Sequence, residues 1–202
     1  MSDPTDRDLL VLARQGRAEA FGVLFERYAR AVYNFCFRRT ANWSVAEDLT
    51  SIVFLEAWRR RDTELLSPSA LPWLLGVATN ALRNHRRSLA RHRAALARVP
   101  APEPHPDHAD ALAERLDDQQ RMRTILEALS RLPLPDQEVV ALVSWTGLSY
   151  EEAAAALGVP VGTVRSRLSR ARTRLRELAE RSGHGSGEAL ASAAVERTEE
   201  ER

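Results

Sequence analysis

The sequence contains no lysine, only one cysteine and no long apolar run, and each shortage excludes a class of protein. A single cysteine, Cys36, cannot form an internal disulfide, which argues for a reducing compartment. No stretch reaches the roughly 18 uncharged apolar residues of a membrane-spanning helix, and the acidic start MSDPTDRDLL is unlike a signal peptide. We therefore expect a cytoplasmic protein that does not insert into a membrane.

Catalytic signatures are also missing from the sequence. There is no glycine-rich phosphate-binding loop, no Gly-x-Ser-x-Gly elbow and no His-Glu-x-x-His zinc motif. His105, Asp107, His108 and Asp110 carry metal-binding groups, but their proline-rich surroundings offer no scaffold. We expect no enzyme activity, no metal site and no cofactor. Cys36 continues an apolar stripe, so we expect it to be a small buried residue rather than a redox-sensitive thiol.

Arginine accounts for all 29 of the Lys and Arg residues. A GC-rich genome explains such usage, so the placement of the arginines is more informative than their number. The formal net charge is only +1, and any basic surface must therefore be balanced by acidic segments. Two basic clusters lie at 83–98, with six arginines and no acid, and at 161–181, with seven arginines and two acids.

Two segments of unusual composition divide the chain. Residues 99–116 are rich in proline and acid, which predicts an extended linker, and the glycine-containing residues 183–202 predict a flexible tail. The remaining blocks, 1–98 and 117–182, show helical periodicity without the period-two alternation of strands. We predict an all-α fold of two small helical domains joined by an extended, acidic, proline-rich linker.

Capping signals and prolines place the helices within these blocks. In the first block, Ser44 and Glu47 form a capping-box pattern before one helix, and Pro72 suits the first turn of the next. Four shorter helices are expected in the second block, at about 117–130, 135–146, 149–156 and 160–182.

The stretch LSYEEAAAALGVPVGTVRSRLSR at 148–170 has the spacing of a helix-turn-helix. Ser149 and Glu152 predict a capping box, and Gly158 can end that helix in the left-handed conformation. Val164, six residues later, points back to the core. The exposed face of the last helix would contact DNA through Thr163, Arg165, Ser166, Arg167, Ser169, Arg170, Arg172 and Arg174. The last two of these suit the phosphate backbone rather than the bases.

A second polar face lies on the helix that begins near Pro72. Amides, arginines and an aromatic ring at helical spacing suit the unstacked bases of single-stranded nucleic acid. The candidate residues are Trp73, Asn80, Arg83, Asn84, Arg86 and Arg87. The simpler alternatives are core packing for the tryptophan and an ordinary solvated face for the asparagines.

The chain resembles the sigma-70 family of bacterial RNA polymerase subunits, specifically its small extracytoplasmic-function (ECF) group. The stretches that carry the resemblance are AEDLTSIVFLEAW at 46–58, PWLLGVATNALRNHRR at 72–87 and a longer one at 132–178. It implies an alternative sigma factor that binds core polymerase, recognises −35 and −10 promoter elements and promotes melting. The first block would be region 2 and the second block region 4.

The resemblance also implies partners for individual segments. The helix with Asp48, Leu49, Phe54 and Trp58 would dock on the β′ clamp helices, although Ser51 and Ile52 depart from the family pattern beside it. The helix at 72–87 would capture −10 bases near Asn80. The second block would lie on the β flap and read the −35 element, and the acidic linker would pass through the RNA exit path. An anti-sigma factor is a further implied partner.

Two other functions are compatible with parts of the sequence. One is a helix-turn-helix regulator that is not a polymerase subunit, and the other is an adaptor that binds single-stranded nucleic acid. Permanent burial of both basic surfaces against the rest of the chain would contradict the sigma-factor interpretation.

Overall fold

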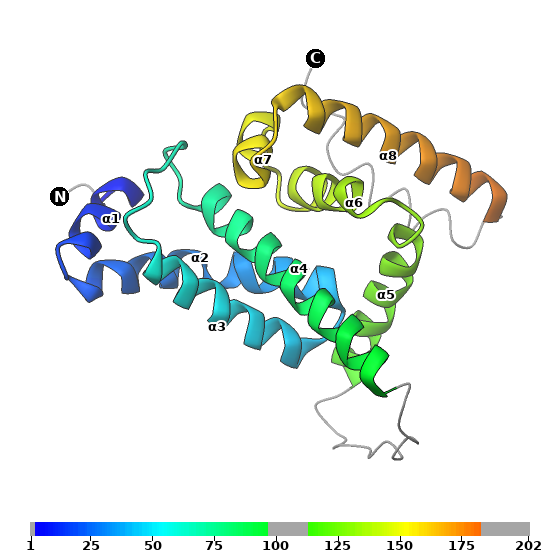
Figure 1. Ribbon diagram of the computed structural model, residues 1–202, viewed down its shortest axis with the longest axis horizontal. Coiled ribbons are helices and arrows are strands. Elements are labelled where there is room, and N and C mark those ends of the chain that lie inside the picture. Colours follow the sequence, from blue (N-terminus) through cyan, green and yellow to red (C-terminus); the bar gives the residue numbers. More distant parts are fainter. Residues whose placement is uncertain (1–2, 97–112, 183–202) are drawn as a thin grey trace.

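The computed structural model describes residues 3–96 and 113–182, and this part of the chain is helical and contains no strand (Figure 1). The all-α prediction is therefore confirmed. The helices are α1 (Asp6–Arg14), α2 (Ala18–Thr40), α3 (Trp43–Arg59), α4 (Leu71–Leu96), α5 (Ala113–Leu129), α6 (Leu134–Val140), a π-helical turn η1 (Ala141–Trp145), α7 (Tyr150–Leu157) and α8 (Val161–Ser182). Helix α5 begins inside the range expected for the linker. Most of that linker, the histidine–aspartate group within it and the tail lie outside the described residues.

Helices α1 to α4 form the N-terminal module, in which buried Asp6 joins three segments. Its carboxylate accepts hydrogen bonds from the Tyr28 hydroxyl on α2 and from the backbone N–H of Ala70, the latter at 2.7 Å. It also pairs with the guanidinium of Arg27. Because Asp6 is only 4% exposed, these partners replace the water that the carboxylate loses on burial. The first helix therefore fixes the segment that enters α4.

Two local predictions for this module have different outcomes. Cys36 is fully buried, as expected, and burial raises the pKa of its thiol to about 12. The expected capping box of Ser44 and Glu47 is wrong, because Asn42 caps α3 by accepting a hydrogen bond from the Val45 backbone N–H at 3.0 Å. Asparagine and serine are equally good N-cap residues, so the helix begins one residue before the expected cap.

The helix-turn-helix of the C-terminal module forms as predicted. Ser149 and Glu152 make a capping box at the start of α7, and Gly158 ends the helix at φ 65° and ψ 39°. The backbone N–H of Val159 then bonds the Ala154 carbonyl at 3.1 Å, which completes a Schellman-type ending. Val164 is buried as expected, together with Leu168, Ala171 and Leu175 on the same face of α8, whereas Leu178 is only partly buried.

The two modules pack against each other, which the sequence analysis did not predict. Helix α4 lies between α2 and α3 on one side and α6 and α7 on the other (Figure 1), and the buried apolar residues of both modules form one continuous cluster. Gly76 permits this contact. A Cβ at this position would lie 2.6 Å from the Ala156 carbonyl oxygen of α7, so any side chain would collide with backbone. We call this junction the interdomain contact; it comprises Gly76 with Ala156, and the polar pairs described below.

Gly158→Val should destabilise the protein by about 1–3 kcal/mol, because a β-branched residue is strained at positive φ. Thermal unfolding followed by circular dichroism would show this as a lower melting temperature. Gly162→Ala is the matched control, since a Cβ there meets open space and φ is not positive. Equal melting temperatures for the two variants would contradict the assigned turn.

Candidate nucleic-acid interface

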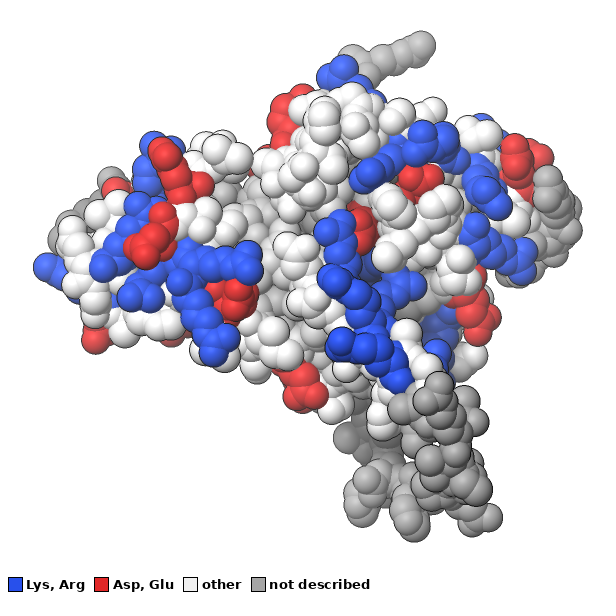
Figure 2. All heavy atoms as spheres, viewed as in Figure 1, with Lys and Arg blue, Asp and Glu red and all other residues white. Residues whose placement is uncertain are grey.

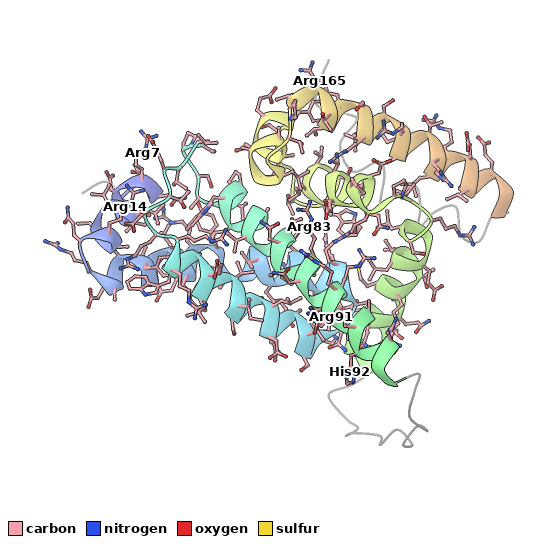
Figure 3. All side chains as sticks on the ribbon, in the orientation of Figure 1. Arg7, Arg14, Arg83, Arg91, His92 and Arg165 are labelled. Carbon is pink, nitrogen blue, oxygen red and sulfur yellow. The ribbon has the colours of Figure 1, made fainter. Side chains whose placement is uncertain are left out.

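The start of α8 presents an exposed polar face to solvent. Arg165, Ser166 and Ser169 are exposed there, and Figure 3 shows Arg165 pointing away from the N-terminal module. The Arg165 guanidinium lies 5.9 Å from the Tyr150 ring centroid, a cation–π contact between α8 and the start of α7. The geometry leaves this face open to a groove of double-stranded DNA.

The other α8 residues expected to bind DNA differ in their exposure and contacts. Arg170 donates to the carboxylate of buried Asp136 on α6 at 3.3 Å, so it links α8 to α6. Thr163, Arg167 and Arg172 are partly buried, and Arg174 is exposed. Arg170 therefore also has a structural role that the sequence analysis did not detect.

The polar face of α4 meets the C-terminal module. Arg83 makes a two-pronged ion pair with Glu138 of α6, with its Nε 2.6 Å from Oε1 and its Nη2 2.5 Å from Oε2. Arg86 donates to the Gln137 side-chain oxygen at 3.5 Å. Figure 3 shows Arg83 in the junction between the modules, and Figure 2 shows arginines forming a band over the C-terminal half of α4. The interdomain contact thus uses part of the surface expected to bind the −10 element.

The amides on this face are ordered by neighbouring arginines. The Asn80 side-chain oxygen accepts from Arg83 at 3.2 Å, and that of Asn84 accepts from Arg87 at 3.0 Å. Both asparagines are exposed, whereas Trp73 is partly buried and packs against the core. Only part of the basic face of α4 is covered, and the polar face at the start of α8 is exposed. The two basic surfaces are therefore not both buried, and the condition that would contradict the sigma-factor interpretation is not met.

Two further polar contacts join the modules. Ser67, in the loop before α4, donates to the Glu152 carboxylate of α7 at 3.2 Å. Arg38 of α2 donates to the Trp145 carbonyl at 3.3 Å. The loop before α4 and helix α2 are therefore also in contact with the C-terminal module.

Burial corrects the expected polymerase-binding residues on α3. Leu49 and Phe54 are 2% and 5% exposed and belong to the core, so they offer no surface to a partner. Trp58 is partly buried, with its ring edge-on to Phe21 at 5.3 Å, and Asp48 is exposed.

The exposed apolar residues of this region are Phe25, Ile52 and Leu55, about half exposed, which the sequence analysis did not select. Ile52 and Leu55 are three residues apart and share the outer face of α3 with Asp48. The three-residue spacing of Ile52 and Leu55 could have indicated a shared helix face. The segment is so apolar, however, that its sequence does not show which face packs in the core.

The described residues contain no group of side chains arranged to hold a metal ion. Within the same ranges, no helix combines the length and apolarity needed to cross a membrane.

Comparison with known proteins matches both modules. Residues 24–92 match the model of sigma-70 region 2, and residues 122–175 match that of sigma-70 region 4. The sigma factor CarQ of Myxococcus xanthus is 34% identical over 177 residues, which are 82% of this chain and 92% of CarQ. The ECF sigma factor SigC of Mycobacterium tuberculosis is 32% identical over 174 residues, 85% of this chain and 91% of SigC.

A solved structure has the same architecture. The sigma factor RpoE of Bartonella quintana, in complex with the anti-sigma factor NepR, has a TM-score of 0.58 and 26% identity, over 79% of this chain and 96% of RpoE. The helical modules with their arginine faces define a two-part nucleic-acid-binding protein. The chain belongs to the sigma-70 family of RNA polymerase sigma factors, in its ECF group. The alternative of a regulator unrelated to polymerase has no support, because the N-terminal module matches region 2.

Arg165→Ala should weaken transcription from a −35-dependent promoter, since a lost base contact costs about 1–3 kcal/mol. Run-off transcription with core enzyme, on a promoter selected from a library, measures the effect. Arg176→Ala, which removes an exposed arginine farther along α8, is the control. Equal losses for the two variants would show that this end of α8 has no special role in reading the promoter.

Proposed function

We propose that this chain directs core RNA polymerase to promoters by contacting the −35 element with α8 and the −10 element with α4. The observation that carries the proposal is the pair of arginine-rich helical faces, one on each sigma-factor module of a single chain. The exposed start of α8 suits major-groove recognition, and the ordered amides of Asn80 and Asn84 suit the edges of unstacked bases. The protein itself supplies binding and melting, and the polymerase supplies catalysis, in the cytoplasm where both operate.

Core polymerase would bind the outer face of α3. Asp48, Ile52 and Leu55 present an acidic and apolar surface there, and Phe25 of α2 extends it. An apolar patch with a charged rim is the usual composition of a protein-binding surface. The C-terminal module would bind the flap of the β subunit, and an anti-sigma factor is the expected inhibitor.

Promoter binding requires a different arrangement of the modules. The −10 face cannot receive DNA along its full length while Arg83 is paired with Glu138 and α7 packs on Gly76. We infer that the modules separate when the protein binds polymerase, so that the two faces reach two elements of one promoter. The described structure is then the form that precedes this assembly.

Leu55→Asp should weaken binding to core polymerase at least tenfold, because it places a charge in the centre of the apolar patch. Gel filtration of the protein with core enzyme, followed by titration, measures the affinity. Leu89→Asp is the control, as it introduces the same charge at an exposed leucine of α4. Unchanged affinity for Leu55→Asp would remove α3 from the interface.

Asn80→Ala should reduce promoter opening without reducing binding to core polymerase. The amide contacts a base only after that base leaves the duplex stack, so its loss affects the open complex selectively. Permanganate reactivity of thymines in the −10 region reports opening. Asn34→Ala, an exposed asparagine of α2, is the control. Full permanganate reactivity for Asn80→Ala would place base capture elsewhere.

A further inference from the structure

Three arginines from two helices gather around one carboxylate at the interdomain contact. Arg39 of α2 and Arg83 and Arg86 of α4 line the same small cavity as Glu138 of α6. Glu138 is only 3% exposed, and Arg83 uses both of its oxygens. Glu138 is therefore the one acidic side chain among the described residues that line this cavity, against three arginines.

The guanidinium of Arg39 is not fully hydrogen-bonded in this arrangement. Its Nη1 is buried and has no hydrogen-bond partner among the described residues. Burial, and then the charge of Arg86, lower the pKa of Arg39 to about 10, against the opposing effect of Glu138. Arg39 remains protonated at neutral pH, so a partly buried positive charge is left under-compensated.

Among the described residues, the neighbours of Glu138 on α6 do not supply the missing negative charge. Gln137 is neutral and accepts from Arg86, and the Asp136 carboxylate is paired with Arg170 of α8. If α6 moved away, the three arginines would therefore bind another anion, one placed closer to all three guanidinium groups than Glu138 is.

A nucleic-acid phosphate has the chemistry to replace Glu138. Like a carboxylate, a phosphodiester offers two oxygens that match the fork of an arginine, and its charge can be shared by several guanidiniums. The three arginines adjoin the α4 face that carries Asn80 and Asn84, so a strand whose bases reach those amides would bring its backbone to the cluster.

We propose that Arg39, Arg83 and Arg86 form a binding site for a backbone phosphate of the opened promoter strand, and that Glu138 occupies this site until the modules separate. This proposal rests on the proposed function, because it assigns the strand to the −10 region. It adds Arg39 of α2 to the DNA-binding surface and gives Glu138 the role of a phosphate mimic. Separation of the modules and binding of the strand are then coupled, since one excludes the other.

The test uses the full chain and a fluorescent single-stranded 20-nucleotide DNA of mixed sequence, in the absence of polymerase. Glu138→Gln keeps the shape of the side chain and removes its charge, so it should bind the DNA roughly tenfold more tightly, the scale of one charge-assisted hydrogen bond. Glu151→Gln changes the same charge at an exposed position of α7 and should bind like the unmodified protein.

Arg39→Gln, introduced together with Glu138→Gln, should reverse most of that gain. It should also reduce the slope of log affinity against log salt by roughly 0.7, as expected for one phosphate contact to a single strand. Arg30→Gln, at an exposed arginine of the same helix, should leave both quantities unchanged. Arg86→Gln provides a second removal of charge if Arg39→Gln does not fold, which thermal unfolding would reveal.

Three results would overturn the proposal. One is unchanged DNA affinity for Glu138→Gln, and another is an unchanged salt slope on loss of Arg39 or, if Arg39→Gln does not fold, of Arg86. The third is tighter binding of an acidic peptide, poly-glutamate, without tighter binding of DNA, which would make the site a protein-docking site. Core-polymerase binding is measured separately, so failure of the sigma-factor function and failure of this site are distinguishable.

Discussion

The ion pair between Arg83 and Glu138 is the interaction on which the described arrangement of the modules depends. It joins a helix of one module to a helix of the other with short, two-pronged geometry around a carboxylate that is nearly inaccessible to solvent. Such a pair stabilises the packed modules only while both partners are present, because an unpaired charge at this buried position destabilises the structure. Gly76 allows α4 to lie close to α7, and the ion pair links α4 to α6.

The same geometry explains how a protein of nearly zero net charge can carry strongly basic surfaces. Each cationic face has acidic groups of its own chain nearby: Glu138 meets α4, and Asp136 meets α8. Both carboxylates are on α6, a helix of only seven residues that faces both arginine-bearing helices. Nucleic acid therefore has to compete with internal anions for part of its contact surface, which favours partners that offer many phosphates at once.

Several local features could be predicted from the sequence, although the cap of α3 was not, whereas features that join distant residues could not. The Ser149–Glu152 cap and the Gly158 turn depend on residues within a few positions of each other, and both form as expected. Asp6 and the Ala70 backbone are 64 residues apart, and Arg83 and Glu138 are 55 apart, so no periodic pattern connects them.

The choice of buried face also needed the structure. Helix α3 is so apolar that its pattern does not separate core positions from exposed ones. Leu49 was expected to contact polymerase because of the family resemblance, and the structure buries it. On α4, Asn80, Asn84, Arg86 and Arg87 are exposed, but the sequence contains no signal that another part of the same chain would contact this face. A glycine inside a helix, Gly76, was the one indication of a close neighbour.

The Asp6 junction has a practical consequence for work with this protein. Asp6 of α1 bonds the backbone just before α4. A segment fused in front of Asp6 is therefore coupled, through this hydrogen bond, to the helix proposed to act in promoter opening. Arg27 reaches as far as Asp3, so even the residues next to an affinity handle take part in this junction. A purification label fused to that end could therefore alter strand separation while leaving duplex recognition by α8 intact, and a matching label elsewhere would expose the artefact.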